Sequence, residues 1–155
     1  MAHQFEEYIY PGGFREWMHA QLFGDSEQQT AFSKRAAFII NVPVGWSVFG
    51  AAAWIGSDLL WFSLPVMAIL FVNAWFHIAL SLAHNTYVPG TNTSILLHLP
   101  LATYAFYYVS VTWQTEFTQL MTSIMIALLL HMGFLLAARS RGKTSDDDSL
   151  NQTTE

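Results

Sequence analysis

The sequence contains no cysteine, and only 11% of its 155 residues are charged. The absence of cysteine excludes disulfides, thiolate catalysis, iron–sulfur clusters and cysteine-based zinc sites, so histidine and carboxylate side chains remain as metal ligands. Lysine and arginine number only six. They form no patch able to hold a phosphate backbone, and we therefore expect no nucleic-acid partner. The first residues are polar and acidic, so we expect no cleavable signal peptide.

Hydrophobic residues are abundant instead: they make up 53% of the chain, and its mean hydropathy is +0.32. A soluble domain carries about one quarter charged residues, so this composition predicts a membrane protein. Four uncharged apolar stretches are close to the ~20 residues that a helix needs to cross hydrocarbon. They cover residues 36–56, 59–83, 94–113 and 118–138. We therefore predict an all-α integral membrane bundle of four transmembrane helices.

This pattern divides the chain into three regions. Residues 1–35 form an N-terminal segment, in which an apolar stripe between Phe14 and Phe23 predicts an amphipathic helix lying along the membrane surface. Residues 36–138 form the four-helix transmembrane domain. Residues 139–155 form an acidic, hydroxyl-rich tail that we expect to be disordered.

The basic residues indicate how the bundle is oriented. All six either precede the first predicted span or follow the last one: Arg15, Lys34, Arg35, Arg139, Arg141 and Lys143. By the positive-inside rule both termini then face the cytoplasm. An even number of spans also places the termini on one side. We expect a multi-pass protein of the cell (plasma or inner) membrane.

Several histidines fall near the cytoplasmic face of this predicted bundle. His77 lies about two turns from the cytoplasmic end of the second span, with Asn73 one turn deeper on the same face. His98 and His131 enter from the same side. Ionisable side chains within a membrane are costly and usually functional. A hydrogen-bonded contact between helices explains His98 and His131 equally well.

The N-terminal His3-Gln4-Phe5-Glu6-Glu7 segment supplies the remaining candidate ligands. Because positions i, i+3 and i+4 share a helix face, one short helix presents His3, Glu6 and Glu7 together. Neutral imidazoles and carboxylates suit a divalent metal, zinc or non-haem iron, with an open position for substrate or water. We predict that His3, His77 and one or both of Glu6 and Glu7 bind the metal, the other glutamate acting as a general base. An acidic pair complementing the helix dipole is the alternative interpretation.

Two Pro-Gly segments predict tight turns. Tyr87-Val88-Pro89-Gly90 follows the second span, and its Pro-Gly pair favours a type II turn. In the enzyme hypothesis Tyr87 donates a proton or orients the substrate; a simple connection between helices explains Pro89 and Gly90 as well. Tyr10-Pro11-Gly12-Gly13 is expected to end the N-terminal helix and redirect the chain.

Three of these motifs resemble the HXXEE-domain family of small multi-pass membrane proteins. They are His3-Gln4-Phe5-Glu6-Glu7, the stretch from Asn73 to His77, and Tyr87-Val88-Pro89-Gly90, in that order. The resemblance implies no established activity, and an enzymatic role is only a suggestion. Family members usually carry an apolar helix before the first motif. Here either such a helix is missing or the motif lies on a peripheral helix.

The sequence therefore leaves functions of different classes open. The first is a metal-dependent membrane enzyme that acts at the cytoplasmic leaflet on an amphiphilic or lipid-soluble small molecule, surrounded by membrane lipids. The alternative is a non-enzymatic carrier, or a subunit of a homo-oligomer or larger membrane complex. Bis-histidine haem ligation by His77 and His131 is a third and less favoured hypothesis.

Overall fold

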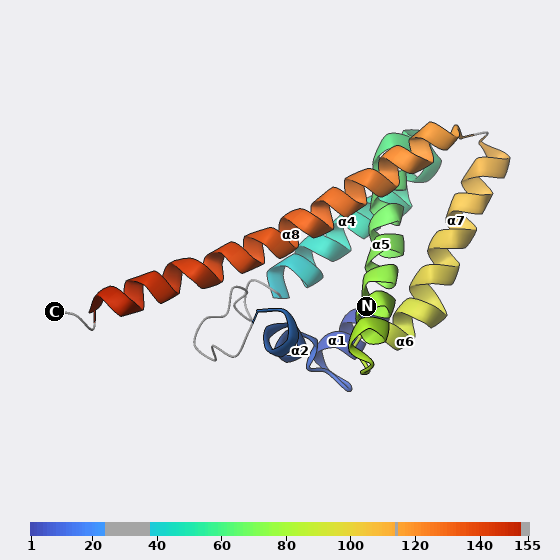
Figure 1. Ribbon diagram of the computed structural model, residues 1–155. Coiled ribbons are helices and arrows are strands. Elements are labelled where there is room, and N and C mark those ends of the chain that lie inside the picture. The colour runs from blue at the N-terminus through green and yellow to red at the C-terminus, as the bar shows by residue number, and fades with distance from the viewer. Residues whose placement is uncertain (24–37, 114, 153–155) are drawn as a thin grey trace.

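The chain is seen in a computed structural model that describes residues 1–23, 38–113 and 115–152 (Figure 1). Within these residues the elements are helices joined by short turns, which confirms the all-α prediction for this part of the chain. The elements are α1 (Ala2–Tyr8), α2 (Phe14–Met18), η1 (His19–Phe23), η2 (Ile40–Val44), α4 (Gly45–Ile55), η3 (Gly56–Leu59), α5 (Leu60–His84), α6 (Thr91–Thr93), η4 (Ser94–His98), α7 (Leu99–Thr112) and α8 (Phe117–Gln152).

Three helices in the described residues are long and apolar enough to cross a membrane: Leu60–His84, Thr91–Thr112 and Phe117–Leu136. The prediction of four spans is therefore wrong for this part of the chain, and the even number of spans that placed both termini on one side no longer supports that placement. The helix expected over residues 36–56 is described as Ile40–Ile55, which has fewer than 18 residues. Even 18 residues rise only about 27 Å, less than the ~30 Å of hydrocarbon. Gly56, which we counted within the span, instead ends this helix at φ 55°.

Helix α5 forms the centre of the bundle and packs against both α7 and α8. Small residues allow this close approach, since Ala68 and Ala127 are fully buried where the helices meet, next to Val72. Large apolar side chains lie on the outside of the bundle, whereas the residues buried at its centre are small. Trp54 is 92% exposed and Leu82 is 76% exposed, as is expected of surfaces that contact lipid.

The C-terminal region differs from the prediction of a disordered tail. Helix α8 continues beyond its apolar part as far as Gln152, so most of residues 139–155 belong to one long helix (Figure 1). Extending an existing helix orders one residue for each hydrogen bond gained, whereas starting a new helix orders several residues for its first hydrogen bond. Continuation of α8 is therefore easier than a new start. The composition of the tail alone does not register this effect.

The short N-terminal helices lie at the end of the bundle where α5 ends and α6 begins (Figure 1). Helix α1 contacts both α2 and α6. Gly12 and Gly13 have φ values of 71° and 86° and redirect the chain between α1 and α2, as predicted. The predicted type II turn is also present: Gly90 has φ 100°, and the amide of Thr91 donates to the carbonyl of Val88 at 3.0 Å.

The predicted interfacial helix is described as α2 followed by the π-helical turn η1. Its aromatic residues pack against the end of α5: the rings of Phe14 and His77 are 4.6 Å apart, and those of Trp17 and His84 are 5.1 Å apart. The remainder of the segment, including Lys34 and Arg35, lies outside the described residues.

Candidate metal centre

Helix α1 turns the polar face of the HXXEE motif towards the bundle. His3, Glu6 and Glu7 are all buried although each is ionisable. This arrangement follows from the i, i+3, i+4 spacing, which places the three side chains on one helical face. A charged group loses its hydration when it is buried, so hydrogen bonds or ion pairs must replace the lost interactions with water.

Glu7 contacts an imidazole on each side. Its Oε1 atom lies 3.3 Å from Nε2 of His3 and 3.0 Å from Nε2 of His77. Ligand atoms of these three buried residues all lie within 4.8 Å of one another. The structure thus brings together a residue from α5 and two residues from α1 that are about 70 positions away in the sequence.

The spacing fits a divalent metal ion. Ligands about 2.0–2.2 Å from a tetrahedral zinc ion lie about 3.3–3.6 Å apart, close to the 3.0 and 3.3 Å between Glu7 and its two histidines. His77 is 1% exposed, and neither of its ring nitrogens has a hydrogen-bond partner of good geometry among the described residues. A buried polar nitrogen left in this way is costly, and a metal ion would satisfy it.

The charge of Glu7 also suits a metal ligand. Burial alone would raise the pKa of this carboxyl, but hydrogen bonds and positive charge from His3 and His77, when these rings carry a proton towards it, lower the pKa to about 2; a cation held between the same rings acts in the same direction. Glu7 is therefore ionised at neutral pH and available as an anionic ligand.

Gly90 closes one side of the cluster. A Cβ atom added at this position would lie 2.6 Å from Cε1 of His77 and 2.8 Å from Cε1 of His3. Only glycine lets the backbone approach both imidazoles so closely at this positive φ. The Tyr87–Gly90 turn is thus part of the site as well as a connection between helices.

Glu6 points to a different set of partners from Glu7. Its two oxygens accept hydrogen bonds from the Tyr87 hydroxyl, from the Thr93 hydroxyl, and from the backbone amides of Asn92 and Thr93 at 2.9 and 2.7 Å. Burial would raise the pKa of Glu6, but these donors lower it overall. All four donors hold the carboxylate of Glu6 at the start of α6. Glu6 thereby connects helix α1 to the Tyr87–Gly90 turn.

Tyr87 contacts Glu6 and is 45% exposed. Partial burial and the hydrogen bond to the Glu6 carboxylate both raise the pKa of its hydroxyl, which therefore stays protonated at neutral pH. The structure places Tyr87 and Glu6 together, and it places Glu7 with His3 and His77.

Thr93 connects these two groups, and sequence reasoning did not identify it. Its single hydroxyl hydrogen is donated to the Glu6 carboxylate, and its oxygen lies 2.8 Å from Nδ1 of His3. His3 must then donate Nδ1–H to Thr93. In a neutral imidazole this leaves Nε2 as a lone pair facing Glu7. The sequence shows Thr93 only as one hydroxyl in a polar turn.

Three further polar side chains lie beside the cluster. Nδ2 of Asn73 is 2.9 Å from Nε2 of His3, and the His98 ring centroid is 4.3 Å from that of His3. Nε2 of His131 lies 3.4 Å from Oδ1 of Asn73, while Nδ1 of His131 lies 3.0 Å from the carbonyl of Ala127. Asn73 thus lies between His3 and His131, and these contacts link His131 to the cluster that contains His77.

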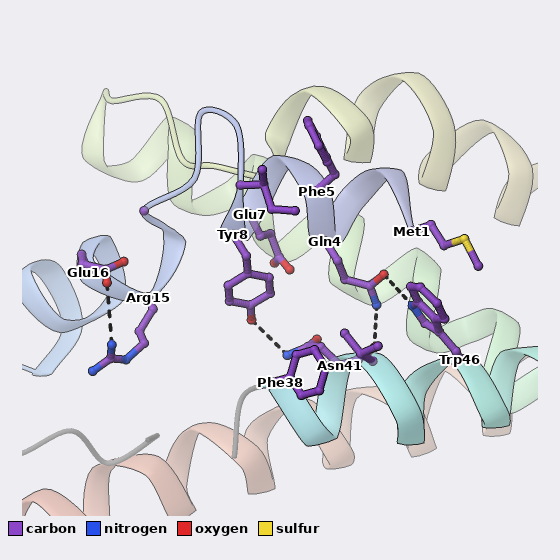
Figure 2. A pocket seen from close by; sticks show the side chains of 13 residues that line it. Met1, Gln4, Phe5, Glu7, Tyr8, Arg15, Glu16, Phe38, Asn41 and Trp46 are labelled. Carbon is purple, nitrogen blue, oxygen red and sulfur yellow. Dashed lines mark hydrogen bonds and ion pairs between the residues drawn. The ribbon is translucent and has the colours of Figure 1, made fainter. Parts of the chain in front are cut away.

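Two neighbouring cavities share the lining residues Met1, Gln4, Glu7, Asn41 and Trp46. One, of about 530 Å³, extends from the cluster between α1, α4, α5 and η4; it is lined by His3, Glu7, Asn73 and His98 and by apolar residues that include Phe49, Ile69, Leu70 and Leu101. The other, of about 670 Å³, is lined by Tyr8 and Phe38 as well (Figure 2). Gln4 lines both cavities, where it donates to the Asn41 carbonyl at 2.8 Å and accepts from Trp46 Nε1 at 3.0 Å.

The two glutamates should respond differently to loss of charge. Glu7→Gln is expected to abolish metal binding. Glu6→Gln should retain the metal but lower stability by about 1.5–3 kcal/mol, the range for a hydrogen bond to a charged group. Elemental analysis and thermal unfolding of both variants check this. Metal retained in Glu7→Gln but absent from Glu6→Gln would assign the ligand to Glu6.

Comparison with known proteins gives one family. A family model described as a protein of unknown function with HXXEE motif matches residues 1–105. The match includes every residue of the cluster and of the Glu6–Thr93 network, but not His131. No curated protein matches the chain, and no solved structure matches it.

Proposed function

The chain belongs to the HXXEE family, whose function is unknown, and we propose that it is a metal-dependent membrane enzyme. In this proposal it acts on an amphiphilic or lipid-soluble small molecule, with the metal held by His3, Glu7 and His77. The observation that carries the proposal is the convergence of two imidazoles and one carboxylate, all buried, at the edge of a cavity.

This ligand set suits catalysis. Two histidines and one carboxylate bind zinc in several hydrolytic enzymes and bind iron in non-haem oxygenases, in each case with positions left open. A metal ion bound here would act as a Lewis acid and would lower the pKa of water.

The chain's own residues have separate tasks in this proposal. Glu6 acts through Thr93 to fix the tautomer of His3, so that Nε2 faces the metal position. His98 lines the cavity, and its ring centroid lies 4.3 Å from that of His3. In this proposal His98 takes a proton from water and returns it to a leaving group.

The cavity supports an amphiphilic substrate. Its polar groups gather at the metal cluster, whereas Phe49, Ile69, Leu70 and Leu101 form apolar walls deeper in the bundle. A substrate of this shape places its reactive polar end near His98 and Glu7 and its hydrocarbon part between α4, α5 and α7.

We also propose that the site faces the cytoplasm. The supporting observation is the concentration of lysine and arginine before residue 36 and after residue 138. A reporter fused after Gln152 should be active only as a cytoplasmic reporter. Activity of an external reporter at that position would reverse the orientation.

The reaction is tested with the purified full chain in lipid vesicles, using fluorogenic esters and amides that carry acyl groups of increasing length. We expect metal-dependent hydrolysis that favours longer acyl groups and is lost in Glu7→Gln and reduced in His98→Ala. If a fully metal-loaded chain hydrolyses none of these probes, the hydrolytic form of the proposal is wrong.

A further inference from the structure

We propose that the side-chain oxygen of Asn73 is a fourth protein ligand to this metal, oriented by His131. The inference rests on the proposed metal site and adds the part of it that comes from within the membrane. Its starting point is the position of Asn73, which lies on α5 one turn from His77 and between two imidazoles.

The first of these imidazoles is His3, whose protons are fixed by its neighbours. Ionised Glu6 takes the hydroxyl hydrogen of Thr93, so the Thr93 oxygen accepts Nδ1–H of His3 at 2.8 Å. Nε2 of a neutral His3 is then a lone pair. Asn73 lies 2.9 Å from that atom.

The second imidazole is His131, and its protons are fixed in the same way. Its Nδ1 lies 3.0 Å from the carbonyl of Ala127, which can only accept a hydrogen bond. Nδ1 therefore carries the hydrogen, and a neutral His131 presents a lone pair at Nε2, 3.4 Å from the Asn73 amide. A charged imidazolium within the bundle would be costly.

Asn73 thus lies between two lone pairs but has only one NH₂ group to offer. If its nitrogen faces His3, it occupies the lone pair that a metal would use, and its oxygen faces the lone pair of His131. If the amide is turned by 180°, its nitrogen donates to His131 and its oxygen faces the metal position beside His3. The amide nitrogen and oxygen are similar in size, so the second orientation needs no further rearrangement.

Only the second orientation satisfies every group once a metal is present. Nε2 of His3 and Oδ1 of Asn73 then both face the cation, and His131 accepts from Nδ2. Oδ1 then takes the place of Nδ2, which lies 2.9 Å from Nε2 of His3, a distance close to the 3.0 Å between Glu7 and His77. A catalytic ion with four protein ligands needs a fifth position for substrate, which favours an ion that accepts five or six ligands, such as ferrous iron.

The experiment measures the dissociation constants of Co²⁺ and Fe²⁺ for the purified full chain by chelator competition, together with the Co²⁺ visible spectrum. Asn73→Leu should weaken binding and change the spectrum, whereas Asn73→Asp, which keeps an oxygen, should not weaken it. His131→Leu should weaken binding about 10- to 100-fold, as loss of an outer-shell partner does. Ser63→Ala, at the other end of α5, is the matched control and should change neither.

The outcomes separate the two proposals. If the unaltered chain binds neither ion, the metal site itself is wrong. If it binds them, and Asn73→Leu leaves both the dissociation constants and the Co²⁺ spectrum unchanged, the metal site stands and the assignment of Asn73 is wrong.

Discussion

His77→Ala is expected to remove the bound metal completely. His77 is the one member of the three-residue cluster that comes from the long helix α5, and its Nε2 lies 3.0 Å from the Glu7 carboxylate. Without it, His3 and Glu7 remain as two ligands on one short helix, too few for a stable site of this kind. Elemental analysis of the purified full chain should find one metal per chain in the unaltered protein and none in the variant.

The matched control for this change is His84→Ala. His84 lies seven residues later on the same helix, is only partly buried, and packs against Trp17. Its replacement should leave the metal content unchanged. Circular dichroism in detergent must show that both variants keep their helices. Folded His77→Ala protein that still contains one metal per chain would contradict the assignment.

Gly90→Ala should have an effect of similar size through geometry alone. The added Cβ would lie 2.6 and 2.7 Å from two atoms of the His77 ring, inside their van der Waals contact distance. We expect a cost of about 1–2 kcal/mol for the left-handed backbone and a further 1–3 kcal/mol for the overpacking. The displaced imidazoles should also lose the metal.

Gly13→Ala separates these two contributions. Gly13 has a similar positive φ of 86°, but a Cβ there would meet no atom within 4 Å among the described residues. This variant should show only the backbone cost in thermal unfolding and should keep its metal. If Gly90→Ala and Gly13→Ala lose equal stability and both retain the metal, the close packing of Gly90 on the imidazoles has no functional role.

The sequence predicted the helical elements well where composition and turn chemistry agree. The apolar stretches over residues 59–83, 94–113 and 118–138 correspond to the three helices that are long and apolar enough to cross a membrane, with small shifts at their ends. The stretch at 36–56 is described as the shorter apolar helix Ile40–Ile55, which Gly56 ends, and residues 36 and 37 lie outside the described part of the chain. The tail misled because composition ignores a helix that is already formed upstream.

Sequence reasoning also had limits at the site. The spacing of His3, Glu6 and Glu7 predicts a shared buried face, and the structure shows one. It cannot predict that adjacent glutamates take different partners, because that depends on where α6 begins. Thr93 and Gly90 contribute through contacts between distant segments, for which one sequence carries no periodic signal.

X-ray absorption at the metal edge of the loaded full chain tests the central claim most directly. We predict a first shell of nitrogen and oxygen atoms at about 2.0–2.2 Å, with the outer-shell scattering of two imidazole rings. A shell of oxygen atoms alone, with no imidazole scattering, would mean that the ion is held elsewhere and that His3, Glu7 and His77 are not its ligands.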